Sequence, residues 1–475
     1  YMVSTTMHFM PGCEILQSFD LVHWEHVTYV YETLDHTDAQ QLKSGQNIYG
    51  QGMWAASLRY HEGRFYICFV ANDTRKTYLY TSEKIDGPWK KQLIEGFYHD
   101  GSLLFDEDGR NYIVYGNDEI WITELNEDLT APKKDGLHRL LVSDHKNPEL
   151  GYEGSHIQKI NGYYYIFLIH SLRDRWMRTE ACFYSDSLEG EFTGGDVLCD
   201  DRGYCGQGVA QGGIVDTPDG KWYAMLFQDF GAVGRIPILL PVTWKDHFPF
   251  FGQNGHVPEE IEVHSTRPGY IYQPLVGSDD FCNGLLPRWQ FNHDPDPRYY
   301  HLDALQGTYT ITTREVCTEL TQAVNTLTQR MSYPSCAAEV TVDASALKEG
   351  DVAGLCVLQS CYAAVGITKH HGKYEVLMLD KKEDGILDMT EGTVVESHQM
   401  DFRLEADFCN MKDEARCYYR VNKGDWLPIG TVHKLYFKLD HFTGCRFGLF
   451  CYAAEETGGS ACFRDFKYYD VDEIS

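Results

Sequence analysis

Short runs of alternating hydrophobic and polar residues, separated by glycine turns, make up the first half of the chain. Four of these turns lead into aromatic-rich segments, HEGRFYICFV at 61–70, EDGRNYIVYG at 107–116, INGYYYIFLI at 160–169 and PDGKWYAMLF at 218–227. Alternation on both sides of such a turn predicts a β-hairpin, and the Asn161-Gly162 pair is the strongest of these signals. The turn glycines Gly63, Gly109, Gly162 and Gly220 follow one another at steps of 46, 53 and 58 residues.

This repeat predicts an architecture as well as single hairpins. Units of four strands at roughly this period are typical of β-propeller blades. Counting the unit that begins at Tyr1, we expect a five-bladed β-propeller over residues 1–262. The alternative is an irregular sandwich in which the hairpins coincide by chance.

The pattern of the sequence changes after residues 253–277, a segment that is rich in glycine and proline and carries acidic residues in its first half. Residues 263–277 are interpreted as a linker. From Ser278 onward, short alternating runs such as Ala338–Val342 and Val352–Val357 recur, and no long helical period appears. Residues 278–475 are therefore predicted to form an antiparallel β-sandwich, which makes the whole chain all-β.

Composition narrows the range of functions. The formal net charge is −29, so binding to nucleic acid or another polyanion is not expected. No apolar run approaches the roughly 18 residues of a membrane-spanning helix, so no membrane partner is expected either. The 15 cysteines are odd in number and show no zinc spacing. They are interpreted as small buried hydrophobes in a reducing compartment, which predicts a cytoplasmic location.

Two carboxylates stand at comparable places in neighbouring units. Asp100 precedes its turn glycine by nine residues, and Glu153 precedes Gly162 by the same number. The innermost strands of a propeller surround one axis, so both side chains are expected to point toward it. Glu153 follows Tyr152 and precedes a glycine, a setting that suits a general acid. The alternative for either residue is a solvated loop carboxylate.

Several long motifs, in order, resemble glycoside hydrolase family 43. They include MPGCEILQSFDLVHW at 10–24, HDGSLLFDEDGRNYIVYG at 99–116, YEGSHIQKINGYYYIF at 152–167 and GGIVDTPDGKWYAMLF at 212–227. The C-terminal part is similar to the sandwich of many members through SDDF at 278–281 and GCRFGLFCY at 444–452. The resemblance covers nearly the whole chain. It implies an exo-acting, inverting glycosidase that releases arabinofuranose or xylose from saccharides derived from xylan or arabinan of plant cell walls.

The resemblance also implies roles for single residues. Glu153 matches the general acid, and Asp100 matches the aspartate that modulates the pKa of that acid. Arg235, in GAVGRIPILLPVTW, matches an arginine that reaches into the sugar pocket. Trp54 and Phe9 are expected to line the same pocket.

Two departures from the family pattern are visible. The general base of the family is an aspartate about ten residues upstream of the position of Tyr1, so we expect this base to precede the given chain. Many members have a histidine where Gln211 stands, and there it helps to hold a central calcium. Gln211 is expected to bind substrate. No cofactor is required by the resemblance, and a calcium bound through the Gln211 amide is the one metal it leaves open.

Other functions remain open at this point. Without its base, the chain would be a catalytically incomplete carbohydrate-binding propeller. A propeller that binds another protein is a further alternative, but it leaves Asp100, Glu153 and Arg235 without a role.

Overall fold

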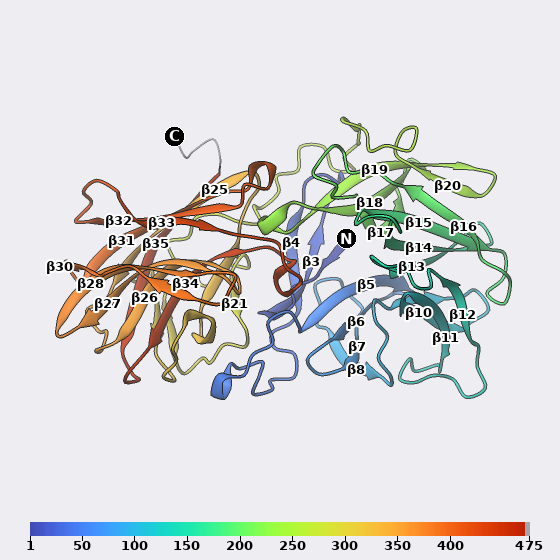
Figure 1. The fold of residues 1–475 in the computed structure, drawn as a ribbon. Coiled ribbons are helices and arrows are strands. Elements are labelled where there is room, and N and C mark those ends of the chain that lie inside the picture. The colour runs from blue at the N-terminus through green and yellow to red at the C-terminus, as the bar shows by residue number, and fades with distance from the viewer. Residues whose placement is uncertain (471–475) are drawn as a thin grey trace.

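The computed structural model describes residues 1–470 and is all-β, with a five-bladed β-propeller followed by a β-sandwich (Figure 1). Both predicted architectures are confirmed. Helical structure in the described residues is limited to five 3₁₀ turns of three residues each. Within the same residues, no helix is long and apolar enough to cross a membrane. All 15 cysteines are free.

Each blade is a separate antiparallel sheet, and four of the five sheets have four strands. The first blade contains β1 (Met2–Ser4), β3 (Gly12–Gln17) and β4 (Glu25–Tyr31). The second contains β5 (Met53–His61), β6 (Arg64–Ala71), β7 (Lys76–Ser82) and β8 (Lys90–Ile94). The third contains β9 (Ser102–Phe105), β10 (Asn111–Asn117), β11 (Glu119–Leu125) and β12 (His138–Ser143). The fourth contains β13 (Glu153–Ile160), β14 (Tyr163–Ser171), β15 (Arg178–Ser185) and β16 (Thr193–Leu198). The fifth contains β17 (Ala210–Asp216), β18 (Trp222–Asp229), β19 (Arg235–Lys245) and β20 (Phe248–Phe251).

The inner strands β5, β13 and β17 share one irregularity near their first residue. Their register with the next strand shifts between Met53 and Ala56, between Glu153 and His156, and between Ala210 and Gly213. The third blade follows the same scheme, because Ser102 pairs with Val114 and the His99 carbonyl accepts a hydrogen bond from Gly116 N at 3.1 Å. A β-bulge leaves residues unpaired and re-aims their side chains. The repeated bulge therefore turns one side chain per blade toward the axis.

The position of the bulge shows that Asp100 and Glu153 are not equivalent residues of their blades, contrary to the sequence-based expectation. Counted from the bulge, the residue equivalent to Glu153 is His99, and Asp100 is equivalent to Gly154. Both carboxylates precede their turn glycine by nine residues, but the turn after β9 is longer than the Asn161-Gly162 turn. Equal spacing therefore does not place them at equivalent positions, and they differ by one residue. Asp100, Gly154 and Gln211 have φ values of 48°, 67° and 59°, as expected of one repeated left-handed position.

A buried arginine connects three of the inner strands. The Arg59 guanidinium of β5 donates to the Leu103 carbonyl at 3.0 Å, to Ser102 Oγ at 2.7 Å and to the Ile157 carbonyl at 2.9 Å. Burial lowers the pKa of Arg59 to about 10, so the side chain remains charged near neutral pH. These bonds fix β9 and β13 relative to each other, and these strands carry the predicted site residues.

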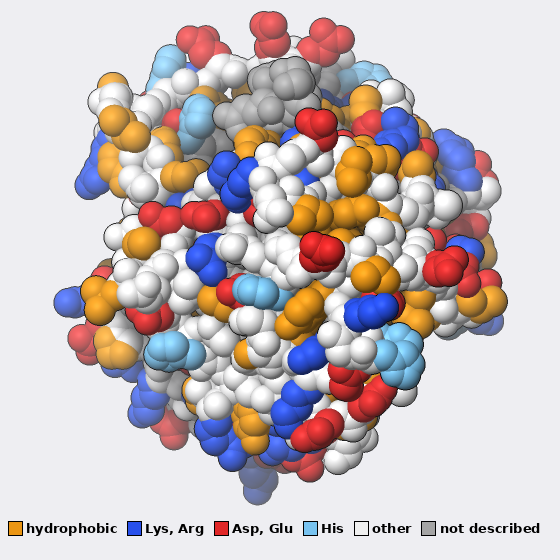
Figure 2. All heavy atoms as spheres, turned by 90° about the vertical axis from the view of Figure 1, so that its left-hand side faces the viewer, with side chains coloured by type: hydrophobic (Ala, Val, Ile, Leu, Met, Phe, Trp, Pro, Cys, Tyr) orange, Lys and Arg blue, Asp and Glu red, His pale blue; other side chains and the backbone are white. Residues whose placement is uncertain are grey.

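The sandwich consists of two antiparallel sheets around a common apolar core. One sheet contains, in spatial order, β2 (Phe9–Met10), β21 (Gln290–Asn292), β24 (Leu327–Arg330), β34 (Arg446–Ala453), β26 (Asp351–Leu358), β27 (Ala363–His370), β28 (Lys373–Lys381) and β29 (Leu387–Met389), with β30 (Thr393–Val395) also on β28. The other contains β22 (Tyr300–Asp303), β23 (Thr308–Thr312), β35 (Ser460–Asp470), β25 (Ser335–Asp343), β31 (Gln399–Asp407), β32 (Glu414–Val421) and β33 (Leu427–Lys434). At the far end of the sandwich, acidic and basic side chains are interspersed (Figure 2).

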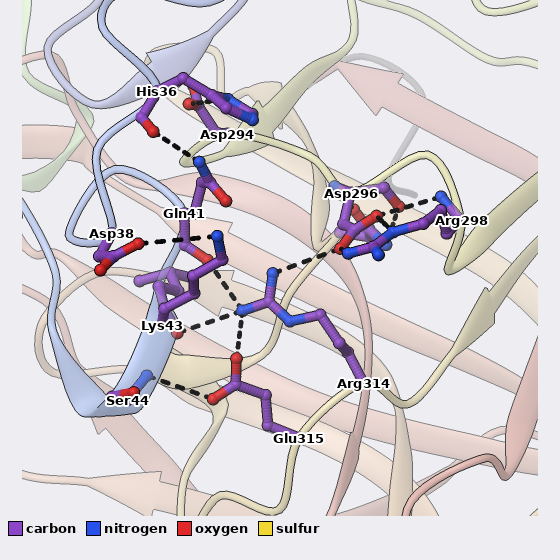
Figure 3. Close-up of polar contacts among 12 residues, drawn as sticks. His36, Asp38, Gln41, Lys43, Ser44, Asp294, Asp296, Arg298, Arg314 and Glu315 are labelled. Carbon is purple, nitrogen blue, oxygen red and sulfur yellow. Dashed lines mark hydrogen bonds and ion pairs between the residues drawn. The ribbon is translucent and has the colours of Figure 1, made fainter.

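One strand departs from the division of the chain into two units. β2 follows β1 of the first blade in sequence, but it pairs with β21 and so joins the edge of a sandwich sheet. The long connection from the first to the second blade also contacts the sandwich (Figure 3). There His36 pairs with Asp294 at 2.9 Å, and Arg314 donates to the Gln41 carbonyl at 2.9 Å. The two units are thus fastened by backbone pairing as well as by side chains.

Candidate active site

Glu153, Asp100 and His99 meet at the axis of the propeller. His99 Nε2 lies 3.6 Å from Asp100 Oδ2 and 3.7 Å from Glu153 Oε2. Glu153 Oε2 also accepts a hydrogen bond from Asn117 Nδ2 at 2.9 Å, and Asp100 Oδ2 accepts one from Gly154 N at 3.1 Å. The two predicted carboxylates are therefore brought together, and a histidine lies between them.

The burial of this group affects its charges. Burial raises the pKa of Asp100 to about 6, and the charge of Glu153 adds to the rise, whereas His99 opposes it. Burial by itself would lower the pKa of His99. The Glu153 carboxylate, 3.7 Å from Nε2, and the negative charge of Asp100 outweigh this effect, so the pKa of His99 is raised. The Glu153 side chain keeps 22% of its surface exposed, so it can reach a bound ligand.

Arg235 approaches from the fifth blade, at the start of β19. Its Nε lies 3.4 Å from Asp229 Oδ1, and Arg178 pairs with the other oxygen of the same carboxylate. Burial lowers the pKa of Arg235 to about 10, while Asp229, Glu153 and Asp100 favour its charged form. Arg235 is therefore a cation near neutral pH within electrostatic reach of both catalytic candidates.

Aromatic rings surround the arginine and the histidine. The Trp54 ring centroid lies 6.1 Å from that of His99 and 5.5 Å from that of Phe442. The Arg235 guanidinium lies over two rings, 4.2 Å from the centroid of Phe227 and 4.3 Å from that of Phe442. The structure thus places Trp54 beside His99, and its role in lining the sugar pocket stays a prediction.

Phe442 belongs to the sandwich, and the loop that carries it is anchored to the propeller. Cys445 N donates to the Ala232 carbonyl at 2.9 Å, and Ala232 N donates to Asp413 Oδ1 at 3.1 Å. A Cβ on Gly444 would lie 2.0 Å from the Val233 carbonyl oxygen, so this approach requires glycine. The sandwich therefore supplies Phe442, whose ring packs against the Arg235 guanidinium.

Phe9 is not at the site. It lies in β2, is fully buried, and packs in a cluster of sandwich side chains under the Arg446 guanidinium, 3.7 Å from its ring centroid. Its prediction as a pocket residue assumed that the segment stays within the first blade. The transfer of β2 to the sandwich sheet removes it from the axis.

Gln211 lies on the axis, where few protein oxygens surround its side chain. Its backbone N donates to Glu180 Oε2 at 2.7 Å, and its side chain packs against Gly154. A small cavity there has Asp100, His156 and Gln211 as its larger polar residues. Burial lowers the pKa of His156 to about 3, which keeps that ring neutral. Calcium takes six to eight oxygen ligands, of which the Asp100 carboxylate and the Gln211 amide are the side-chain candidates here, so water would have to supply most of the others.

In residues 1–470, one group brings three potential metal ligands within 4.8 Å of one another, and it consists of His99, Asp100 and Glu153. Asn117 and Gly154 already donate to its two carboxylates. We assign the group to proton chemistry rather than to a metal. A separate open hollow lies between turns of the first and fifth blades and the segment 263–266, and none of its lining residues belongs to the site.

Sequence reasoning missed four of the groups described here. His99 and Asn117 contact the carboxylates, Asp229 pairs with Arg235, and Phe442 supports Arg235. Of these, His99 could have been found, because it directly precedes Asp100 in the motif that carried the resemblance.

A propeller whose axis gathers two carboxylates, an arginine and aromatic rings has the fold and site of a glycoside hydrolase. The chain belongs to Glycosyl hydrolases family 43, which matches residues 1–249. Residues 278–469 match the Beta xylosidase C-terminal Concanavalin A-like domain. The family resemblance noted in the sequence is therefore confirmed.

Individual proteins are similar over most of the chain. A beta-xylosidase of Formosa agariphila is 25% identical over 533 residues, covering 99% of this chain and 86% of that protein. A non-reducing end alpha-L-arabinofuranosidase of Bacteroides ovatus is 23% identical over 417 residues, covering 82% and 76%. The solved structure of a bifunctional GH43-CE protein of Bacteroides eggerthii has a TM-score of 0.91 and 42% identity. The match covers 100% of this chain and 61% of that chain.

Proposed function

We propose that this protein is an exo-acting, inverting glycosidase that releases arabinofuranose, xylose or both from the ends of xylan- or arabinan-derived chains. The observation that carries the proposal is the meeting of Glu153, Asp100 and Arg235 at the axis, from three different blades. The names of the relatives, beta-xylosidase and non-reducing end alpha-L-arabinofuranosidase, support this substrate class.

In this proposal Glu153 is the general acid. Its carboxyl donates a proton to the glycosidic oxygen as the bond to the leaving sugar breaks, and Asn117 orients it by donating to Oε2. Arg235 would bind a sugar hydroxyl, and Trp54 would offer its face to the sugar ring. In inverting enzymes, a base roughly 6.5–9.5 Å away activates water on the opposite face.

Product analysis with the full-length protein tests the proposal. We expect single pentoses from xylo- and arabino-oligosaccharides, with polymer length nearly unchanged, and NMR should show that the first product has the inverted anomeric configuration. Internal oligosaccharides as main products, or retention of configuration, would contradict it. Glu149→Ala is a suitable control variant and should give the wild-type products, because Glu149 is an exposed acid on the loop before β13.

We also propose that hydrolysis requires no metal, since few protein oxygens surround the Gln211 side chain. Dialysis against a strong chelator should leave kcat unchanged. A loss of activity that added calcium restores would show that the axial residues rearrange around an ion.

A further inference from the structure

His99 occupies the place in the third blade that Glu153 occupies in the fourth. Its carbonyl accepts from Gly116 N, so its backbone is held just before β9. Its side chain is 19% exposed, and within residues 1–470 its Nε2 has no partner that meets hydrogen-bond geometry. That nitrogen lies almost equally far from the two carboxylates, at 3.6 and 3.7 Å. A small rotation of either carboxyl group would complete a hydrogen bond.

The charges around His99 favour its cationic form. Asp100 adjoins it in sequence, and Glu153 faces it from β13. One cation opposes it from further away, Arg75 from the turn after β6. The near contacts are both carboxylates, so a proton on Nε2 meets two acceptors. Two buried carboxylates without such a cation would repel each other.

We propose that His99 is a positioning residue, whose Nε2–H bridges Asp100 and Glu153 and holds the Glu153 carboxyl in the orientation from which it donates its proton. This inference rests on the proposed function. The transferred proton comes from Glu153, and His99 keeps its own throughout. Asn117 Nδ2 donates to the same oxygen, Oε2, that faces His99 Nε2, so both side chains act on this one oxygen of the Glu153 carboxyl.

Kinetics of His99→Phe and His99→Gln test this role. On xylobiose, whose leaving group needs a proton, His99→Phe should lower kcat about 10- to 100-fold while KM changes less than about threefold. On an aryl glycoside with an acidic phenol as leaving group, the loss should be only a few-fold. His99→Gln keeps an N–H donor and should recover part of the rate. His61→Gln is the control, because His61 lies at the far end of β5, stacked on Phe105.

A second measurement does not depend on turnover. Titration of ¹³Cε1-labelled histidine by NMR should show that the His99 pKa falls in Glu153→Gln, while the His61 signal is unaffected. An unchanged His99 titration, or equal losses by His99→Phe on both substrates, would overturn the proposal. If the protein cleaves no glycoside but the His99 titration shifts as expected, the proposed function fails and the bridge between His99 and Glu153 stands.

Discussion

His99, on the propeller axis, lies among carboxylates, whereas His8, at the contact between propeller and sandwich, lies among other histidines. The His8 ring centroid is 4.8 Å from that of His293 and 5.4 Å from that of His441. Burial lowers the pKa of His8 well below its usual value, and the nearby His293, His441 and Arg446 lower it further. The same residue type is thus favoured as a cation at one place and as a neutral ring at the other.

The difference separates a reactive region from a structural one. At the axis, opposite charges are held close but incompletely hydrogen-bonded, so a proton can move or a ligand can bind. At the contact, Asp440 lies 3.6 Å from His441 Nδ1, but the charges that act on His8 come mainly from His293, His441 and Arg446, so the His8 imidazole contributes apolar area and shape only as long as it stays neutral. Experiments that change the charge at either place should therefore have different readouts, activity at the axis and stability at the contact.

The largest effect is expected from Glu153→Ala in the full-length enzyme. Loss of the proton donor should lower kcat by roughly 10²–10⁴-fold on substrates with poor leaving groups. Substrates whose leaving group departs without a proton should lose far less. Thermal unfolding should change little, because the Glu153 side chain is partly exposed. Equal losses on both substrate types would argue against the role of Glu153 as the acid.

The next effect concerns the charge of Asp100. Its raised pKa, about 6, means that the carboxyl takes up a proton as the pH falls through 6 and loses its negative charge. Wild-type kcat/KM should therefore decline below about pH 6. Asp100→Asn, which is neutral at every pH, should be roughly 10²-fold slower near the optimum and lack this decline. An acid limb that persists unchanged in the variant would assign the titration to another group.

The sequence predicts the blades and the sandwich because local signals repeat. Alternation and glycine turns are short-range, and Asn161-Gly162 forms the two-residue turn between Ile160 and Tyr163 that the pattern indicates. Asp100 and Glu153 were found from their spacing to the turn glycines, and Arg235 was found only through the family resemblance. Phe442 and Phe9 could not be placed, since their positions depend on how the sandwich docks. That docking carries Phe442 to Arg235 and pulls Phe9 away with β2.

The smallest effect, and the sharpest contrast with the axis, is expected from His8→Phe. Neither ring nitrogen of His8 has a hydrogen-bond partner within residues 1–470, so phenylalanine should replace it with little loss at pH 7.5. The pKa of His8 is depressed in the folded protein. Below its unfolded pKa of about 6.5, the unfolded chain therefore takes up a proton that the folded protein does not. The stability of the wild type is full above that pH and falls below it.

A histidine that stays neutral in the folded protein lowers the free energy of unfolding by about 1.4 kcal/mol for each pH unit below 6.5. In urea unfolding, His8→Phe should thus gain about 1.4 kcal/mol on the wild type between pH 7.5 and pH 5.5. Carboxyls with a raised pKa, such as Asp294 at about 6, act with the opposite sign, but they are the same in both proteins and cancel in the difference. The exposed His301 provides the control, because His301→Phe should show no such gain. A wild type and His8→Phe that lose stability in parallel would mean that His8 accepts a proton in the folded state, as His99 does at the axis.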